Sequence, residues 1–293
     1  MSRLWIMGCG DIGRRVARLY QTQGVQATGW VRSQASLSLG MQLGIDMRLG
    51  DMDQGCFFPR NAFEQAEIFW LMPPPNSGLI DNRLRRFLLA VQKAPKRIVL
   101  ISTTGVYGDC AGRWIDESEP IKPTVERSKR RADAELALQE WGEKYGGDWV
   151  ILRVPGIYSA ERLPLERLQR GEPVLLEAAA PWTNRIHADD LARICERAMQ
   201  FAPKASIYNA CDGQPSTMTE YFNQVADYAG LPRPPQLSLA EASSVVSKGM
   251  LSYLQESRRI RNDKLLQELG LQLLYPSLAA GLQAMPKRDA SCY

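Results

Sequence analysis

A glycine-rich segment near the N-terminus constrains the fold of this chain more than any other feature. A short apolar run, residues 4–7, precedes the turn Gly8-Cys9-Gly10-Asp11-Ile12-Gly13, and a helical pattern then continues to Gln23. A second apolar run covers residues 25–31. This order predicts a strand, a tight turn, a helix and another strand, which is how a parallel α/β sheet begins.

The spacing of the glycines indicates a phosphate site. The first glycine permits the tight turn, the second lets the backbone approach a pyrophosphate, and the third lets the helix pack closely against the strand. The start of the helix adds free N–H groups and the positive end of the helix dipole. We therefore predict that a dinucleotide contacts Gly8, Gly10, Asp11, Ile12 and Gly13. A purely structural glycine turn is the alternative.

The second predicted strand indicates which dinucleotide is bound. An NAD site usually has an acidic residue about 20 residues after the turn, whereas an NADP site accommodates the 2′-phosphate with arginine. No acidic residue lies between Asp11 and Asp46, and the strand is followed by Arg32 and Ser33. A guanidinium group suits a phosphate. We expect NADP(H) to be preferred over NAD(H), with a solvated Arg32 as the alternative.

Two further strand ends are expected to complete the cofactor site. Residues 47–49 form a short strand, and residues 68–72 form an apolar strand that ends at proline. Loops at the carboxyl ends of parallel strands line the ligand crevice. We therefore expect the cofactor beside Asp51, Met52, Leu71, Met72 and Pro73. Asp51 is a candidate acceptor for an adenine amino group or, equally, a turn-forming residue.

The remaining apolar segments alternate between strands and helices. Helical patterns cover 79–94 and 125–145, and apolar strands cover 98–101, 149–152 and 207–210. This alternation predicts α/β architecture, a Rossmann-type doubly wound parallel sheet with a smaller C-terminal substrate lobe. The large domain is expected to comprise residues 1–158 and 183–212, and the lobe residues 159–182 and 213–293. The two helical stretches also offer an apolar face for a homodimer.

Composition excludes several classes of partner. The chain has 293 residues and a net charge of +4, too small to indicate nucleic-acid binding. It lacks an apolar run of about 18 residues, so no membrane partner is expected. The six cysteines form no C-x-x-C pair and there is one histidine, so no metal site is expected. Because a strand begins by Leu4, no signal peptide is expected, and we predict a reduced, cytoplasmic protein.

Several motifs occur in a characteristic order. They are the glycine turn, the segment Ser102–Gly108 (STTGVYG), the segment Leu152–Tyr158 (LRVPGIY), the segment Arg185–Ala192 (RIHADDLA) and the segment Tyr208–Ala210 (YNA). With these motifs the chain resembles the atypical extended short-chain dehydrogenase/reductases, within the NAD(P)-dependent epimerase/dehydratase family. The resemblance covers nearly the whole chain. It implies oxidoreductase or epimerase-like chemistry on a nucleotide sugar or another carbonyl compound.

The family's catalytic residues are Ser or Thr, Tyr and Lys, and the lysine binds the nicotinamide ribose. The resemblance places Thr103 and Lys129 at two of these positions, with a solvated lysine as the alternative for Lys129. The tyrosine should stand four residues before the lysine, where this sequence has Val125. Tyr107 is our candidate substitute and Tyr158 a second, although packing is the alternative role for both. Loss of the proton donor leaves a second function open, that of a non-catalytic NADP(H)-binding sensor or regulator.

Other motif residues are expected around the substrate, which should lie between the nicotinamide and the lobe. Pro155 and Ile157 are expected to wall the nicotinamide side. Arg153 and Arg185 are each candidates for contact with an anionic substrate or for a structural ion pair. His187 stands beside two aspartates, which indicates a hydrogen-bonded structural residue more than a catalyst.

Overall fold

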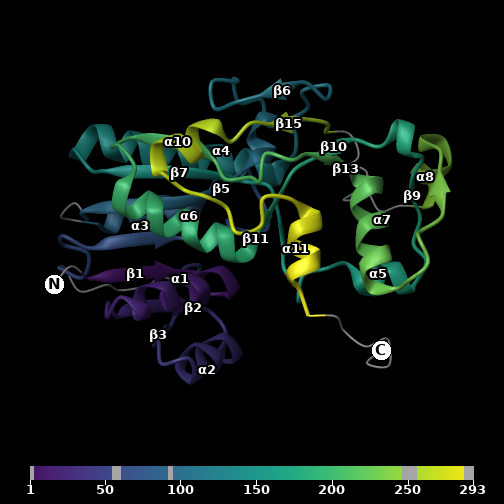
Figure 1. Cartoon of the computed structure of the whole chain (residues 1–293). Helices are drawn as coiled ribbons and strands as arrows, with labels where there is room; N and C mark the ends of the chain where they lie inside the picture. Colours follow the sequence, from purple (N-terminus) through teal and green to yellow (C-terminus); the bar gives the residue numbers. More distant parts are fainter. Residues whose placement is uncertain (1–2, 55–60, 92–94, 246–255, 287–293) are drawn as a thin grey trace.

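A seven-stranded parallel sheet forms the centre of the protein, in the order β12-β7-β5-β4-β1-β2-β3 (Figure 1). The computed structural model describes residues 3–54, 61–91, 95–245 and 256–286. The strands are β1 (Leu4–Met7), β2 (Ala27–Val31), β3 (Asp46–Leu49), β4 (Glu67–Trp70), β5 (Arg97–Thr103), β7 (Trp149–Val154) and β12 (Ser206–Asn209). The chain runs outward from β1 in one direction and then from β4 in the other, so the predicted Rossmann-type doubly wound sheet is confirmed.

Helices cover both faces of this sheet. The main ones are α1 (Asp11–Thr22), α2 (Gln34–Gln42), α3 (Asn82–Ala90), α4 (Glu126–Tyr145), α6 (Ala188–Phe201) and α10 (Asp263–Leu269). One apolar cluster joins the sheet to α1, α6 and α10, and the other joins it to α3 and α4. Along β5, Val99 belongs to the first cluster and Ile98 and Leu100 to the second. Burial on both faces explains why these strands are continuous apolar runs.

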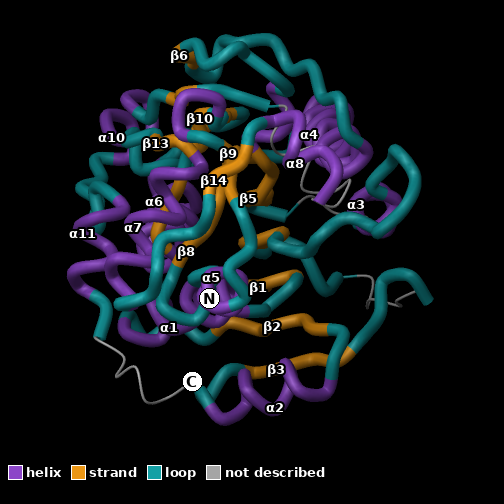
Figure 2. Tube along the Cα trace, turned by 90° about the vertical axis from the view of Figure 1, so that its right-hand side faces the viewer, coloured by secondary structure: helices purple, strands orange, loops and turns teal. Residues whose placement is uncertain are grey.

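A smaller lobe lies beside the sheet, at the right of Figure 1. Its elements are α5 (Leu165–Gln169), β9 (Val174–Leu175), η2 (Glu177–Ala179), α7 (Met218–Ala229), β14 (Gln236–Leu237), α8 (Leu239–Val245) and α11 (Leu278–Ala284). A separate apolar cluster joins α5, α7 and α11. Figure 2 is viewed from this lobe, with β1, β2 and β3 one above another and α2 below them.

Short elements connect the two parts. They are η1 (Thr104–Tyr107), β6 (Trp114–Ile115), β8 (Gly156–Tyr158), β10 (Trp182–Thr183), β11 (Arg185–His187), β13 (Ser216–Thr217) and β15 (Arg259–Ile260). β8 pairs with β11, β10 with β13 and β6 with β15. Leu265 and Leu269 of α10 belong to the sheet's core, so this part of the expected lobe segment 213–293 packs on the large domain.

Local hydrogen bonds decide where several helices begin. Asp81 accepts from Leu84 N at 3.1 Å and caps α3, which therefore starts later than the predicted 79–94. Residues 92–94 of that prediction lie outside the described residues. Helix α4 begins at Glu126 and ends at Tyr145, and its C-cap Gly146 has a φ of +70°, which suits glycine. Within the described ranges, no helix combines the length and apolar character needed to cross a membrane.

Candidate functional site

A cavity of about 440 Å³ lies at the carboxyl ends of β1, β2 and β4, and we call it the first cavity. The glycine turn after β1 lines it through Gly8, Gly10, Asp11, Ile12 and Gly13. The ends of β3 and β4 contribute Asp51, Met52, Leu71, Met72 and Pro73. Residues predicted separately from three strand ends thus meet at one edge of the sheet, as parallel strands require.

The glycine turn has the shape that a pyrophosphate needs. Gly8 has a φ of +89°, and a Cβ there would lie 2.7 Å from Cα of Met72. A Cβ on Gly13 would lie 2.9 Å from Cγ2 of Ile6, whereas a Cβ on Gly10 would meet no described atom within 4 Å. Gly10 therefore borders open space while the other two permit close packing. The N-cap Gly10 has no side chain to cap the start of α1, so the turn could receive an anionic group.

Asp11 carries a negative charge beside this turn, and two arginines compensate it. Its Oδ1 accepts from Nε of Arg15 at 2.9 Å and its Oδ2 from Nε of Arg162 at 2.8 Å. Burial alone would raise the pKa of Asp11, but the bonds from the two arginines outweigh it and lower that pKa. Arg162 belongs to the chain just after β8 and lines the first cavity.

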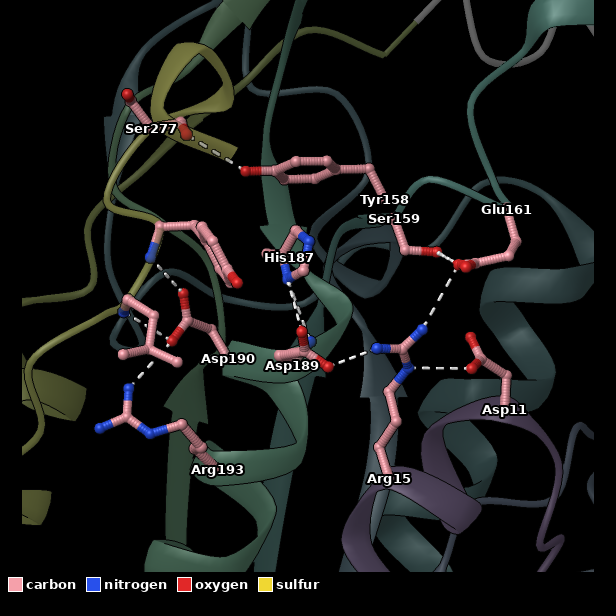
Figure 3. A network of polar contacts seen from close by, with 12 residues as sticks. Asp11, Arg15, Tyr158, Ser159, Glu161, His187, Asp189, Asp190, Arg193 and Ser277 are labelled. Carbon is pink, nitrogen blue, oxygen red and sulfur yellow. Dashed lines mark hydrogen bonds and ion pairs between the residues drawn. The ribbon is translucent and has the colours of Figure 1, made fainter. Parts of the chain in front are cut away.

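The same arginine network holds the start of the lobe against α1 (Figure 3). Arg15 contacts Glu161 at 3.5 Å and also pairs with Asp189 at the start of α6. Glu161 in turn accepts from Oγ of Ser159 at 2.8 Å. The glycine turn, the lobe and α6 are therefore joined by one set of charged side chains.

The loop after β2 also borders the first cavity. Arg32, Ser33 and Ser36 line it. Ser33 accepts from the backbone N of Ser36 at 3.3 Å and caps α2. Arg32 is exposed at the cavity, where the sequence predicts contact with a 2′-phosphate. Asp51 accepts from the backbone N of Asp53 at 2.9 Å, so it forms a turn as well as lining the cavity.

Sequence reasoning missed Arg83, which lines the first cavity from α3. Its Nε donates to Asp53 at 2.8 Å and its Nη1 donates to the carbonyl oxygen of Pro73 at 2.9 Å. Arg83 therefore fixes the proline loop that walls the cavity. Trp30 was also missed, and its Nε1 donates to the carbonyl oxygen of Gly50 at 3.0 Å. These contacts are long-range, so no local pattern indicates them.

A second cavity of about 400 Å³ adjoins the first. Thr103 lines it from the end of β5 and Pro155 from the loop after β7, whereas Ile157 lines the first cavity. Arg131 of α4 lines both cavities, so they meet at this side chain. Oγ1 of Thr103 accepts from the backbone N of Gly105 at 3.2 Å. Arg131 was not among the predicted residues.

The structure does not bring Lys129 to either cavity. Its side chain is exposed, while Arg127, Ser128 and Arg131 line the second cavity from the same helix. An α-helix turns about 100° per residue, so side chains at 127 and 131 share a face that 129 does not. Val125, the residue four positions before Lys129, is the N-cap of α4. The exposed position of Lys129 favours a solvated side chain over the ribose-binding role that the resemblance implies.

Tyr107 is also placed away from both cavities. Its hydroxyl donates to Oδ1 of Asn209 at 2.7 Å and accepts from Nη1 of Arg153 at 3.0 Å. Burial raises the pKa of Tyr107 to about 12. Arg153 pairs with Glu135 at 2.8 Å, which decides between its two expected roles in favour of a structural ion pair. A buried, fully engaged hydroxyl is not available as a proton donor to a substrate.

Tyr158 and His187 have structural contacts as well. The hydroxyl of Tyr158 donates to the carbonyl oxygen of Ser277 at 3.1 Å (Figure 3). Nδ1 of His187 accepts from the backbone N of Asp189 at 3.2 Å and caps α6, as the structural interpretation of this histidine predicts. Burial lowers the pKa of His187, which favours the neutral ring. Among the described residues, no tyrosine lines either cavity.

The fold defines a Rossmann-type α/β protein whose first cavity is lined by a glycine turn after β1. Residues 83–211 match the model of the NAD dependent epimerase/dehydratase family. The chain is 26% identical to Protein YeeZ of Escherichia coli (strain K12), over 94% of this chain and 97% of the relative.

Solved structures share the fold over nearly the whole chain. A functionally unknown conserved protein from Silicibacter pomeroyi DSS superposes with a TM-score of 0.83 at 25% identity, covering 97% of this chain and 98% of that one. The UDP-glucuronic acid 4-epimerase from Bacillus cereus, in complex with NAD, superposes with a TM-score of 0.76 at 14% identity, covering 96% of each chain.

Proposed function

We propose that the protein binds NADP(H) in the first cavity and acts as an oxidoreductase or epimerase-like enzyme on a small molecule in the second. The observation that carries this proposal is the junction of the two cavities at Arg131, with Thr103 on the substrate side. A nicotinamide dinucleotide supplies hydride exchange when bound. The complex of the Bacillus cereus epimerase with NAD supports a dinucleotide here.

The chain's own residues would bind and orient the two molecules. The glycine turn receives the pyrophosphate, and Arg32 with Ser33 and Ser36 receives the 2′-phosphate. Thr103 uses an oxygen lone pair to accept from Gly105, which leaves its own O–H to donate to a substrate oxygen. The name of the Bacillus cereus enzyme makes nucleotide sugars the first compounds to screen, followed by other carbonyl compounds.

The proposal extends to location and assembly. We propose a cytoplasmic protein that forms a homodimer through α3 and α4. Leu89 of α3 is 80% exposed and Leu136 of α4 is 51% exposed, which supports an apolar contact there. Sedimentation velocity of the purified protein tests this assembly. A monomer at every accessible concentration would contradict it.

The second candidate function is a non-catalytic NADP(H)-binding sensor or regulator. It is favoured by Val125 at the position expected for the catalytic tyrosine and by the absence of tyrosine from both cavities within the described residues. General acid–base catalysis contributes about 10²- to 10⁴-fold to rate, so its loss would leave little turnover. A sensor would bind the cofactor tightly and distinguish its oxidised from its reduced form.

Titration with NADPH, NADP⁺, NADH and NAD⁺, followed by a substrate screen, separates the two functions. The enzyme predicts that a substrate changes the absorbance of the reduced nicotinamide. The sensor predicts binding without such a change. Failure of all four dinucleotides to bind would contradict both.

A further inference from the structure

The second cavity has an excess of positive charge. Arginines line it from three places in the chain: Arg127 and Arg131 of α4, Arg185 of β11, and Arg258. Among the described residues that line it, Glu256 is the single acidic one. Glu256 already pairs with Arg258 at 2.9 Å, so it does not balance Arg131 or Arg185.

Arg185 is buried yet has no carboxylate within ion-pair distance in the described part of the chain. Its Nη1 donates to the carbonyl oxygen of Asn184 at 2.8 Å, and its guanidinium carbon lies 4.0 Å from the ring centroid of Tyr221. A Cβ on Gly156 would lie 3.4 Å from this side chain, so the glycine makes room for it. Buried charges in proteins are normally paired, and this one lacks its partner.

Asp212 is the acidic residue whose charge acts most on Arg185, and it is itself a poor counter-ion. Its Oδ1 accepts from the backbone N of Gln214 at 3.0 Å. Burial raises the pKa of Asp212 to about 7, so a large fraction of this carboxyl group is neutral near neutral pH. The charge of Arg185 therefore remains largely unbalanced.

Arg131 reaches the cavity from α4 and is also without an ion pair among the described residues. It donates to the carbonyl oxygen of Met72 at 3.2 Å. The acidic residues that act on it are Asp81 and Glu135. Asp81 caps α3, and Glu135 pairs with Arg153. Burial lowers the pKa of Arg131 to about 10, which still leaves the guanidinium charged at neutral pH.

We propose that Arg131 and Arg185 together hold an oxyanion, a carboxylate or phosphate group, on the part of the substrate that lies beside Thr103. A guanidinium group binds either oxyanion through two parallel hydrogen bonds. Because Arg131 also lines the first cavity, this anionic group lies close to the reacting carbon. The inference rests on the proposed function for the presence of a cofactor, and it names a class of substrate different from a neutral sugar ring.

Isothermal titration calorimetry of the full-length protein tests this proposal, with inorganic phosphate and oxalate as probes. We expect wild-type protein to bind at least one probe, with and without NADP⁺. Arg131→Gln and Arg185→Gln should each weaken that binding by roughly tenfold or more. Arg170→Gln is the matched control, since Arg170 is an exposed lobe residue that pairs with Glu172 at 2.7 Å. Stronger binding of phosphate indicates a phosphate ester, and stronger binding of oxalate indicates a carboxylate.

Two results would overturn the proposal: no binding of either probe to wild-type protein, or equal binding by wild type and both cavity variants. If Arg185→Gln does not fold, a selenate soak of wild-type crystals replaces it. Anomalous selenium density between the two guanidinium groups supports the proposal, and its absence from the cavity contradicts it. Dinucleotide titration of the same protein distinguishes failure of this inference from failure of the proposed function. Binding of a dinucleotide without binding of phosphate or oxalate refutes this inference alone. Binding of an oxyanion without binding of any dinucleotide refutes the proposed cofactor.

Discussion

Nε of Arg162 donates to Oδ2 of Asp11 at 2.8 Å, and both residues line the first cavity. The contact joins the chain entering the lobe to the first turn of α1. Arg15 binds the other oxygen of the same carboxylate, so the negative charge of Asp11 in the glycine turn is compensated from two sides. The chain entering the lobe therefore contributes to the charge of the first cavity as well as to the expected substrate site.

Arg162→Gln should weaken dinucleotide binding by roughly two- to fivefold, because partly exposed ion pairs contribute about 0.5–1 kcal/mol. Stability against urea should change little. Fluorescence titration with NADPH measures the affinity. Arg233→Gln is the control, since Arg233 pairs with Asp227 on the exposed surface of the lobe. An equal loss of affinity in both variants would show that the effect is not local.

Gly10→Ala should preserve the fold and reduce dinucleotide affinity by roughly tenfold or more, because the added methyl group would occupy the space that a pyrophosphate needs. Gly8→Ala should instead destabilise the fold by on the order of 2–4 kcal/mol, from its positive φ and the clash with Met72. Thermal unfolding and NADPH titration of both variants distinguish the two effects. Unchanged affinity in folded Gly10→Ala protein would refute a pyrophosphate at this turn.

Arg32→Ala should weaken the binding of NADP(H) by roughly 10- to 100-fold and the binding of NAD(H) far less. Only NADP(H) has a 2′-phosphate that can accept a charge-assisted hydrogen bond from Arg32. Competition titrations with all four dinucleotides give the ratio. Arg48→Ala is the matched control, because Arg48 is an exposed arginine of β3 that pairs with Asp46 at 2.6 Å. An equal loss of affinity for both cofactors, or no loss for either, would contradict the proposed contact of Arg32 with the 2′-phosphate.

Tyr107→Phe should destabilise the protein by about 1–3 kcal/mol, because Asn209 and Arg153 each lose a buried hydrogen-bond partner. Dinucleotide affinity should stay the same, since Tyr107 lines neither cavity. Urea unfolding and NADPH titration measure the two quantities. Lower dinucleotide affinity at unchanged stability would indicate that Tyr107 contributes to the functional site.

Because of Asp212, the free energy of unfolding should decrease as pH rises from about 4 to 7. Burial raises its pKa from 3.8 to about 7 on folding, so between these values the folded state binds more protons than the unfolded state. Each pH unit in this window should cost on the order of 1 kcal/mol. Asp212→Asn keeps the acceptor for Gln214 and should flatten the slope in urea unfolding measured across this range. An unchanged slope would assign the pH dependence to other groups.

The fold and the first cavity follow largely from local sequence patterns. A turn with glycines at 8, 10 and 13 sets the path of the backbone, and apolar runs that end at Asp51 and Pro73 set the ends of two strands. Parallel strands present their carboxyl ends at one edge, so residues predicted from separate strands line one cavity. Ser238 and Glu241 form a local capping pair at the start of α8, with reciprocal hydrogen bonds of 2.8 and 3.3 Å.

The sequence by itself therefore determined the doubly wound sheet and the glycine turn, because each depends on neighbouring residues. Only the tertiary structure decided which side chains reach the second cavity. Helix α4 starts at Glu126 and is oriented so that Arg131 lines the cavity while Lys129 faces solvent. A shift of one residue rotates a side chain by about 100°, so motif spacing alone does not set the face. Whether Arg153 and Arg185 are paired depends likewise on carboxylates far away in the chain.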